Sequence, residues 1–233
     1  MNKNSNGTEA PYARYLSRII RPFPDFDFFF IKSVRAKAVE WLRLQQGERV
    51  LDLGCGPGGS FPFLVEAVGS SGSVIGVDIG HQSCINARRR IERNGWKNVE
   101  VLEAPAQDVR LTGQYDAALM FAAPDVFASE AALENVFPHL REGARVAIFG
   151  AKLSDHFPGR ILNPALRKVV ATFSPATPVP DEEPWRMLAK RIDGLQIQPY
   201  FFGSMFLAAG SVTGNAIVVS PSAGGAELPH RAR

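Results

Sequence analysis

A glycine-rich turn flanked by two carboxylates is the stretch of this sequence best suited to bind a ligand. Residues 50–59 read VLDLGCGPGG, which is a short apolar strand, a turn and the start of a helix. Gly54 and Gly56 lack a Cβ, so the backbone here can approach a ligand closely or adopt a positive φ. Asp78 ends the next apolar run, where a carboxylate is placed to accept hydrogen bonds from two ribose hydroxyls. The pattern predicts a nucleotide-like ligand at this turn.

The segments around the turn alternate between strands and helices. Strands are expected at residues 49–53, 73–77, 98–102, 115–121 and 144–149, and helices at 31–44, 60–68, 81–93 and from Ser129 to Leu140. In the last helix, apolar residues recur at i, i+3, i+4 and i+7 from Leu133, and Ser129 is the expected N-cap. Strands that alternate with helices of this length predict right-handed crossovers and a mostly parallel sheet.

The alternation lapses after Gly150. Residues 151–182 are rich in proline, with a helix expected at 164–173, and such an insertion usually covers the ligand end of a sheet. A helix is expected at 183–192. Two strands, at 195–202 and 204–210, are joined at Gly203, and so short a connection makes them antiparallel.

The two ends of the chain are expected to lie outside this core. Residues 1–44 are expected to form a disordered start with a helix at 10–20 and a helical lid, 45–212 the core with its 151–182 insertion, and 213–233 a disordered tail. Five phenylalanines stand at positions 23, 26, 28, 29 and 30. They are expected either to seal the N-terminal helices onto the sheet or to line a substrate pocket.

Composition narrows the class of protein. The chain has 233 residues, a net charge of +3 and two cysteines, Cys55 and Cys84, which belong to no disulfide framework. The charge is too small to imply a nucleic-acid partner, and no His-rich or Cys-rich cluster suggests a metal. Without an apolar run long enough to span a membrane or a recognisable signal peptide, a cytoplasmic protein with no integral membrane association is expected, its oligomeric state open.

The run Val50–Gly58 resembles the first motif of the class I S-adenosylmethionine-dependent methyltransferases, and the resemblance extends over roughly residues 45–150. Asp52 separates this reading from a nicotinamide-dependent oxidoreductase, in which that position is generally apolar. The antiparallel pair after residue 195 also matches the sixth and seventh strands of the family. The resemblance implies a Rossmann-like α/β fold: a seven-stranded, mostly parallel sheet with the last strand antiparallel, helices on both faces, and an N-terminal helical cap.

The resemblance also implies roles for individual residues toward S-adenosylmethionine. The backbone of Gly54, Cys55 and Gly56 is expected to contact the methionine part. Asp52 either orients the loop or holds the amino acid end, directly or through water. Asp78 is expected to bind the ribose hydroxyls.

The adenine side of the expected site departs from the family pattern. Pro105 stands where the third motif usually has an acidic residue. The adenine edge is then left to the Ala106 amide first, and to Gln107 or Asp108 next. Ile79 is expected to pack on the adenine face.

The acceptor is harder to predict, because the cofactor carries most of the chemistry and the protein mainly aligns a nucleophile. Phe121 and the loop after it are expected beside the sulfonium. The candidate catalytic residues are His156, with a solvated loop histidine as the alternative, and Asp125, which is expected to touch the acceptor; His81 is a candidate for the cofactor rim.

The expected reaction is methyl transfer to an N or O atom, less readily a C atom, of a small apolar or aromatic molecule such as a secondary metabolite. A quinone- or lipid-type acceptor stays open, as does a cofactor-binding accessory protein without activity.

Overall fold

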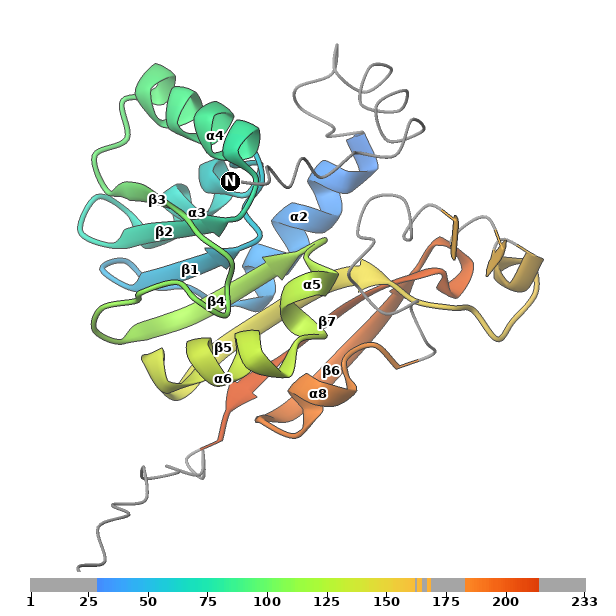
Figure 1. The fold of residues 1–233 in the computed structure, drawn as a ribbon. Coiled ribbons are helices and arrows are strands. Elements are labelled where there is room, and N and C mark those ends of the chain that lie inside the picture. The colour runs from blue at the N-terminus through green and yellow to red at the C-terminus, as the bar shows by residue number, and fades with distance from the viewer. Residues whose placement is uncertain (1–28, 162, 165–166, 169–182, 214–233) are drawn as a thin grey trace, which may run out of the picture.

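The computed structural model describes residues 29–161, 163–164, 167–168 and 183–213. Their centre is one seven-stranded sheet in the order β3-β2-β1-β4-β5-β7-β6 (Figure 1). The strands are β1 Arg49–Leu53, β2 Ser73–Asp78, β3 Val99–Glu103, β4 Tyr115–Phe121, β5 Leu140–Ala151, β6 Ile192–Tyr200 and β7 Met205–Val212. β1 to β5 run parallel, and β7 is antiparallel to both β5 and β6. The predicted Rossmann-like sheet is confirmed.

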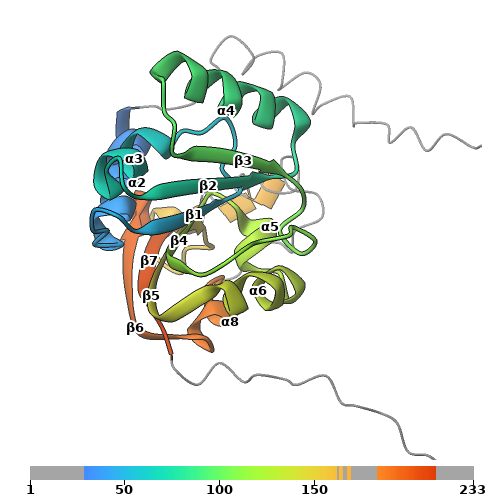
Figure 2. The same cartoon turned by 90° about the vertical axis from the view of Figure 1, so that its left-hand side faces the viewer.

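Helices cover both faces of the sheet (Figure 2). α2 Phe29–Trp41, α3 Phe61–Val68 and α4 His81–Asn94 pack on one face, and α5 Pro124–Phe127, α6 Glu130–Val136 and α8 Arg186–Ala189 on the other. Apolar side chains of the central strands alternate between the two layers: Val50, for example, packs with α2 and α3, whereas Leu51 packs with α5 and α6. Within the described residues, no helix is both long and apolar enough to cross a membrane.

The ends of α6 are set by a side-chain hydrogen bond at its start and by a 3-10 turn after it. The Ser129 hydroxyl accepts a hydrogen bond from the Ala132 amide at 3.3 Å, as its expected role as N-cap requires. The helix stops at Val136, a 3-10 turn spans Phe137–His139, and β5 begins at Leu140, four residues before the predicted strand. The His139 ring, in this 3-10 turn, is hydrogen-bonded to the Gly113 carbonyl at 3.2 Å.

The other differences from expectation lie after β5. The helix predicted at 183–192 is only one turn long, because Ile192 pairs with Val212 and so begins β6. Residues 159–161, 163–164 and 167–168 are helical, whereas the rest of the helix predicted at 164–173 lies outside the described residues. So do the helix at 10–20, Phe23, Phe26 and Phe28, and the tail beyond residue 213.

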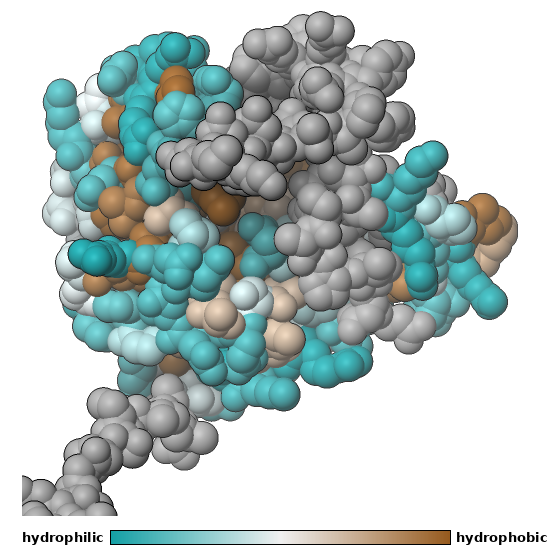
Figure 3. All heavy atoms as spheres, in the orientation of Figure 1, coloured by the Kyte–Doolittle hydropathy of each residue, from teal (hydrophilic) through white to brown (hydrophobic). Residues whose placement is uncertain are grey.

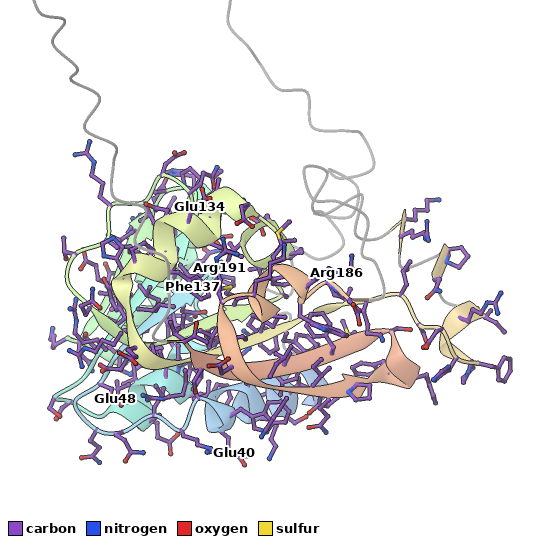
Figure 4. The ribbon with its side chains drawn as sticks, turned by 90° about the horizontal axis from the view of Figure 1, so that it is seen from below. Glu40, Glu48, Glu134, Phe137, Arg186 and Arg191 are labelled. Carbon is purple, nitrogen blue, oxygen red and sulfur yellow. The ribbon has the colours of Figure 1, made fainter. Side chains whose placement is uncertain are left out.

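Two ion pairs link neighbouring segments near the edge of the sheet where β1 begins. The Arg145 guanidinium on β5 donates to the Glu48 carboxylate just before β1, and Arg191 pairs with Glu130 of α6. Figure 4 shows Arg191 beside Phe137, and its guanidinium carbon lies 5.9 Å from the centre of that ring. The opposite edge, where the parallel strands end, is left for a ligand.

Candidate functional site

The glycine turn lies between the ends of β1 and β2 and is anchored to both. The Gly54 and Cys55 amides donate to the Val77 carbonyl at 2.8 and 3.0 Å. Gly54 has a φ of 71°, and a Cβ on it would lie 2.5 Å from the Cβ of Ala123, in the loop after β4. Gly56 has a φ of 55°, and a Cβ there would have no atom within 4 Å. Gly54 is therefore needed for close packing against the β4 loop, whereas Gly56 faces open space.

Asp78, at the end of β2, joins two stretches of backbone. One carboxylate oxygen accepts from the Gly56 amide at 2.8 Å and the other from the Gly80 amide at 2.7 Å. Each oxygen can accept more than one hydrogen bond, so both remain able to accept a ligand hydroxyl. The residue is thus placed for the predicted ribose contact, and it also fixes the shape of the turn.

The Asp52 carboxyl is buried, and its negative charge is only partly balanced by neighbouring groups. The residue is 1% exposed, and within the described part of the chain neither oxygen makes a well-formed hydrogen bond. Burial raises its pKa to about 7, while the Arg35 guanidinium and the Ser60 hydroxyl lie close enough to oppose that rise in part. A buried carboxyl normally has a partner. The ammonium group of a methionine-type ligand would supply one, so this residue fits S-adenosylmethionine.

Sequence reasoning missed Arg35, which α2 brings to the same place. Its Nη1 donates to the Ser60 hydroxyl at 3.0 Å, and its guanidinium carbon lies 4.1 Å from the centre of the Phe121 ring. A signal was available, because Arg35 occupies position i of an i, i+3, i+4, i+7 stripe whose other members, Ala38, Val39 and Leu42, are buried and apolar. A cation on the core face of a helix indicates a buried anionic partner.

The loop after β4 closes the site on the side opposite Asp78. The Phe121 ring stacks on Phe149 with centroids 4.5 Å apart and is 5% exposed. Ala122 has a φ of 58°, and its amide donates to the Phe149 carbonyl at 2.8 Å. This bend directs Ala123 back onto Gly54. Phe121 therefore forms an apolar wall under Arg35, and its place beside the sulfonium stays a prediction.

On the side of the site expected to hold adenine, the side chains of Ile79 and Gln107 are exposed. Ile79 is 65% exposed, although it directly follows a buried strand. Ala106 is buried, and its carbonyl accepts from the Asn135 side chain at 2.9 Å, whereas Gln107 is exposed. The exposed face of Ile79 is the kind of surface that a flat base would cover.

His81 is held by a carboxylate at the rim of the site. Its Nδ1 lies 2.7 Å from Glu103, and Arg88 lies 3.3 Å from the other oxygen of that carboxylate. The hydrogen bond from His81 and the nearby Arg88 lower the pKa of Glu103. Glu103 is opposite Asp78 in the β2–β3 register, so His81 lies on the Asp78 side of the turn.

The two predicted catalytic residues differ in position. Asp125 lies in α5, directly after the β4 loop; partial burial raises its pKa, and the negative charge of Asp78 adds a smaller upward contribution. Its side chain is exposed to solvent. His156 is 83% exposed and pairs with Asp155 at 3.4 Å, in a segment beyond the end of β5. The structure groups Asp125 with the turn, but it does not bring His156 there.

Cys55 and Cys84 are both buried and free, in agreement with the expectation of no disulfide. Burial raises the pKa of both thiols. Neither is therefore a ready nucleophile. No group of three metal-ligating side chains occurs among the residues that the structure describes.

Comparison with known proteins agrees with this geometry. Residues 50–143 match the family model described as a methyltransferase domain. The chain is 33% identical over 123 residues to the 2-phytyl-1,4-beta-naphthoquinone methyltransferase of Arabidopsis thaliana, a match that covers 51% of this chain and 47% of that protein. It is 32% identical over 109 residues to the aklanonic acid methyltransferase DauC of a Streptomyces species, covering 43% of this chain and 47% of the relative. The chain thus spans about half the length of these curated relatives.

A solved structure extends the likeness to nearly the whole fold. A methyltransferase described as S-adenosylmethionine-dependent, from Aquifex aeolicus, superposes with a TM-score of 0.57 at 23% identity, over 87% of this chain and 97% of that one. At this identity the likeness concerns the fold. The match of residues 50–143 to a methyltransferase domain and this shared fold both agree with the resemblance to the class I S-adenosylmethionine-dependent methyltransferases, which implies that molecule as the cofactor.

Proposed function

We propose that this protein transfers the methyl group of S-adenosylmethionine to an N or O atom of a small apolar or aromatic molecule. The observation that carries the proposal is the pairing of a buried Asp52, whose charge is only partly balanced, with an open glycine turn held by Asp78. When bound, the cofactor supplies an electrophilic methyl group on a sulfonium. The chain then has to hold the cofactor, exclude water and align the acceptor.

Each group at the proposed site contributes to holding the cofactor or to excluding water. Asp52 takes the ammonium end of the cofactor, and the backbone of Gly54–Gly56 lies along its methionine part. Asp78 takes the ribose hydroxyls, with Ile79 against the adenine. Ala106, and after it Gln107, completes the adenine edge. Phe121 provides a dry wall near the reacting carbon.

Asp125 is the side chain best placed to accept a proton from the acceptor. A carboxylate with a raised pKa in α5, just after β4, can act as the base for a phenol or an alcohol, whereas an amine needs only a pocket that keeps it neutral. His156 stays a prediction that its exposure does not favour.

The acceptor class is supported by chemistry and by relatives. The named relatives act, by their names, on a phytyl naphthoquinone and on aklanonic acid. A quinone- or lipid-type acceptor is therefore the main alternative to a secondary metabolite, and an accessory protein that binds the cofactor without activity is the other. Exclusion of nucleic acid stays a prediction, because the methyltransferase fold by itself does not decide the substrate.

Calorimetry with S-adenosylhomocysteine, followed by a methyl-transfer screen, tests the proposal. We expect binding by the wild type and a loss of about tenfold or more in Asp78→Asn, since one charge-assisted acceptor is removed. Asp193→Asn on β6, an exposed carboxylate far along the sheet, is the matched control. No binding by the wild type would refute the site. Binding without transfer to quinones, phenols or amines would favour the accessory protein.

A further inference from the structure

One end of the molecule carries exposed aromatic side chains that the proposed reaction does not use. Among the large apolar residues exposed within the described ranges, four come from the segment after β5 and the turn between β6 and β7: Phe157, Ile161, Phe201 and Phe202. We call these four residues the aromatic tip. Phe157 is 81% exposed and Phe202 is 69% exposed. So much apolar surface gathered in one place marks an interaction site more often than chance exposure does.

The aromatic tip is built by specific contacts between its two segments. The buried Ser154 hydroxyl donates to the Phe202 carbonyl at 2.9 Å, and the Asn163 side chain bonds to both the amide and the carbonyl of Ser154. A Cβ on Gly159 would lie 2.1 Å from the Phe202 carbonyl oxygen, so only glycine fits there. The two segments therefore form one unit that displays its aromatic side chains in a fixed arrangement.

The backbone of the β6–β7 turn is also unfavourable for the residues it carries. Phe201 and Phe202 have φ of 48° and 55°, in the left-handed region that glycine or asparagine adopts at much lower energy. Glycine or asparagine would be more stable here if the turn had no role other than reversing the chain. Phe202 combines this strained conformation with a side chain that is 69% exposed, which indicates a role in contacting a partner.

The shape and the charge of this end indicate the kind of partner. In Figures 1 and 4 the segment after β5 and the β6–β7 turn project beyond the rest of the fold. Figure 3 shows hydrophobic atoms capping this projection among hydrophilic ones. Residues 152–168 contain four basic residues, Lys152, Arg160, Arg167 and Lys168, and one acidic residue, Asp155. A projecting apolar apex with a basic surround complements an anionic bilayer, into which rings insert while cations meet headgroups.

We propose that the aromatic tip docks this protein reversibly on anionic phospholipid membranes. This docking goes beyond the proposed function, because it needs neither cofactor nor acceptor. The tip lies at the same edge of the sheet as the glycine turn, since β5 and β6 end there parallel to β1. A docked molecule would present that edge to the bilayer. The quinone- or lipid-type acceptor considered under the proposed function would then reach the site from the membrane.

Vesicle sedimentation with the full chain tests the proposal. The probes are vesicles of phosphatidylcholine alone, and of equal parts phosphatidylcholine and phosphatidylglycerol. We expect binding to the mixed vesicles that weakens with added salt, and about tenfold weaker binding by Phe202→Gly, which removes a ring yet suits the left-handed φ. Arg160→Gln should bind the mixed vesicles about fivefold more weakly, since one interfacial cation contributes about that factor.

Ile197→Thr is the matched control, because Ile197 is 41% exposed on the edge strand β6 but belongs to no part of the aromatic tip. It should bind vesicles as the wild type does. All variants should bind S-adenosylhomocysteine equally, which separates failure of docking from failure of the cofactor site. Absence of wild-type binding, equal binding by Phe202→Gly, or a wild-type dimer that Phe202→Gly dissociates in sedimentation velocity would each overturn the proposal.

Discussion

Replacing Asp52 with asparagine should stabilise the fold while it abolishes cofactor binding. The pKa of Asp52 rises from 3.8 to about 7 in the folded protein because its carboxyl is buried. The folded state therefore holds a proton that the unfolded state has released, and stability falls as pH rises between those two values. The slope is about 1.4 kcal/mol per pH unit, so the whole effect approaches ~4 kcal/mol above pH 7. Asparagine carries no charge, although its own unpaired amide costs about 1–3 kcal/mol.

Urea unfolding at several pH values measures this prediction. Between pH 5 and 7 the free energy of unfolding of Asp52→Asn should rise relative to the wild type by about 1.4 kcal/mol per unit, and the difference should level off above pH 7. At pH 8 the variant should be more stable by about 2 kcal/mol, the balance of the charge and amide effects. A difference independent of pH, or a variant less stable at pH 8, would show that Asp52 is not a strained carboxylate.

The same charge should govern ligand affinity. If the ammonium group of the cofactor binds ionised Asp52, binding releases the proton held below pH 7, and the affinity for S-adenosylhomocysteine should rise by up to tenfold per pH unit until pH 7. Calorimetry in buffers of different ionisation enthalpy counts that proton. Affinity that is flat across this range in the wild type would separate Asp52 from the ligand.

Four further substitutions test the turn, its neighbour Arg35 and the cap of α6. Gly54→Ala should lower both stability and cofactor affinity, because its Cβ would meet Ala123 at 2.5 Å, whereas Gly56→Ala should lower affinity by about tenfold with a smaller loss of stability; equal loss of stability in both, by thermal unfolding, would contradict the open space above Gly56. Arg35→Leu should raise the pKa of Asp52 further and so move the pH dependence of binding to higher pH; an unchanged profile would mean that the guanidinium does not act on that carboxyl. Ser129→Ala should lower the free energy of unfolding by about 1 kcal/mol through loss of the helix cap, with S-adenosylhomocysteine affinity unchanged.

The parallel half of the sheet could be predicted because its signals are local. Apolar runs such as residues 49–53 and 115–121 match β1 and β4 to the residue, and the glycine turn follows from spacing alone. The start of β6 could not be predicted in this way, since Ile192 becomes a strand residue only by pairing with Val212. Residues 183–192 have a helical pattern in isolation, and a pairing partner farther along the chain overrides it.

The candidate site divides in the same manner. Its candidate carboxylates and glycines lie in the glycine-rich motif and at the end of the next strand, so sequence alone could name them, but their surroundings come from three separated segments. Arg35 belongs to α2, Ser60 to the start of α3 and Phe121 to the end of β4, and the three meet only in the folded sheet. Spacing in the sequence identifies the candidate ligand-binding residues. The burial and the neighbouring charges that determine the pKa of Asp52 depend instead on tertiary packing.

That distinction explains why Asp52 is strained in the first place. One cation, Arg35, is near enough to oppose the effect of burial, yet the pKa still reaches about 7. A second positive charge is needed before the carboxylate is fully stable, and the open space beside Gly56 is where a ligand could bring one. An incompletely balanced carboxyl favours a cationic ligand over a neutral or anionic one, because only the former removes the strain. The instability of Asp52 in the free protein is thus itself a source of selectivity for the charged end of the cofactor.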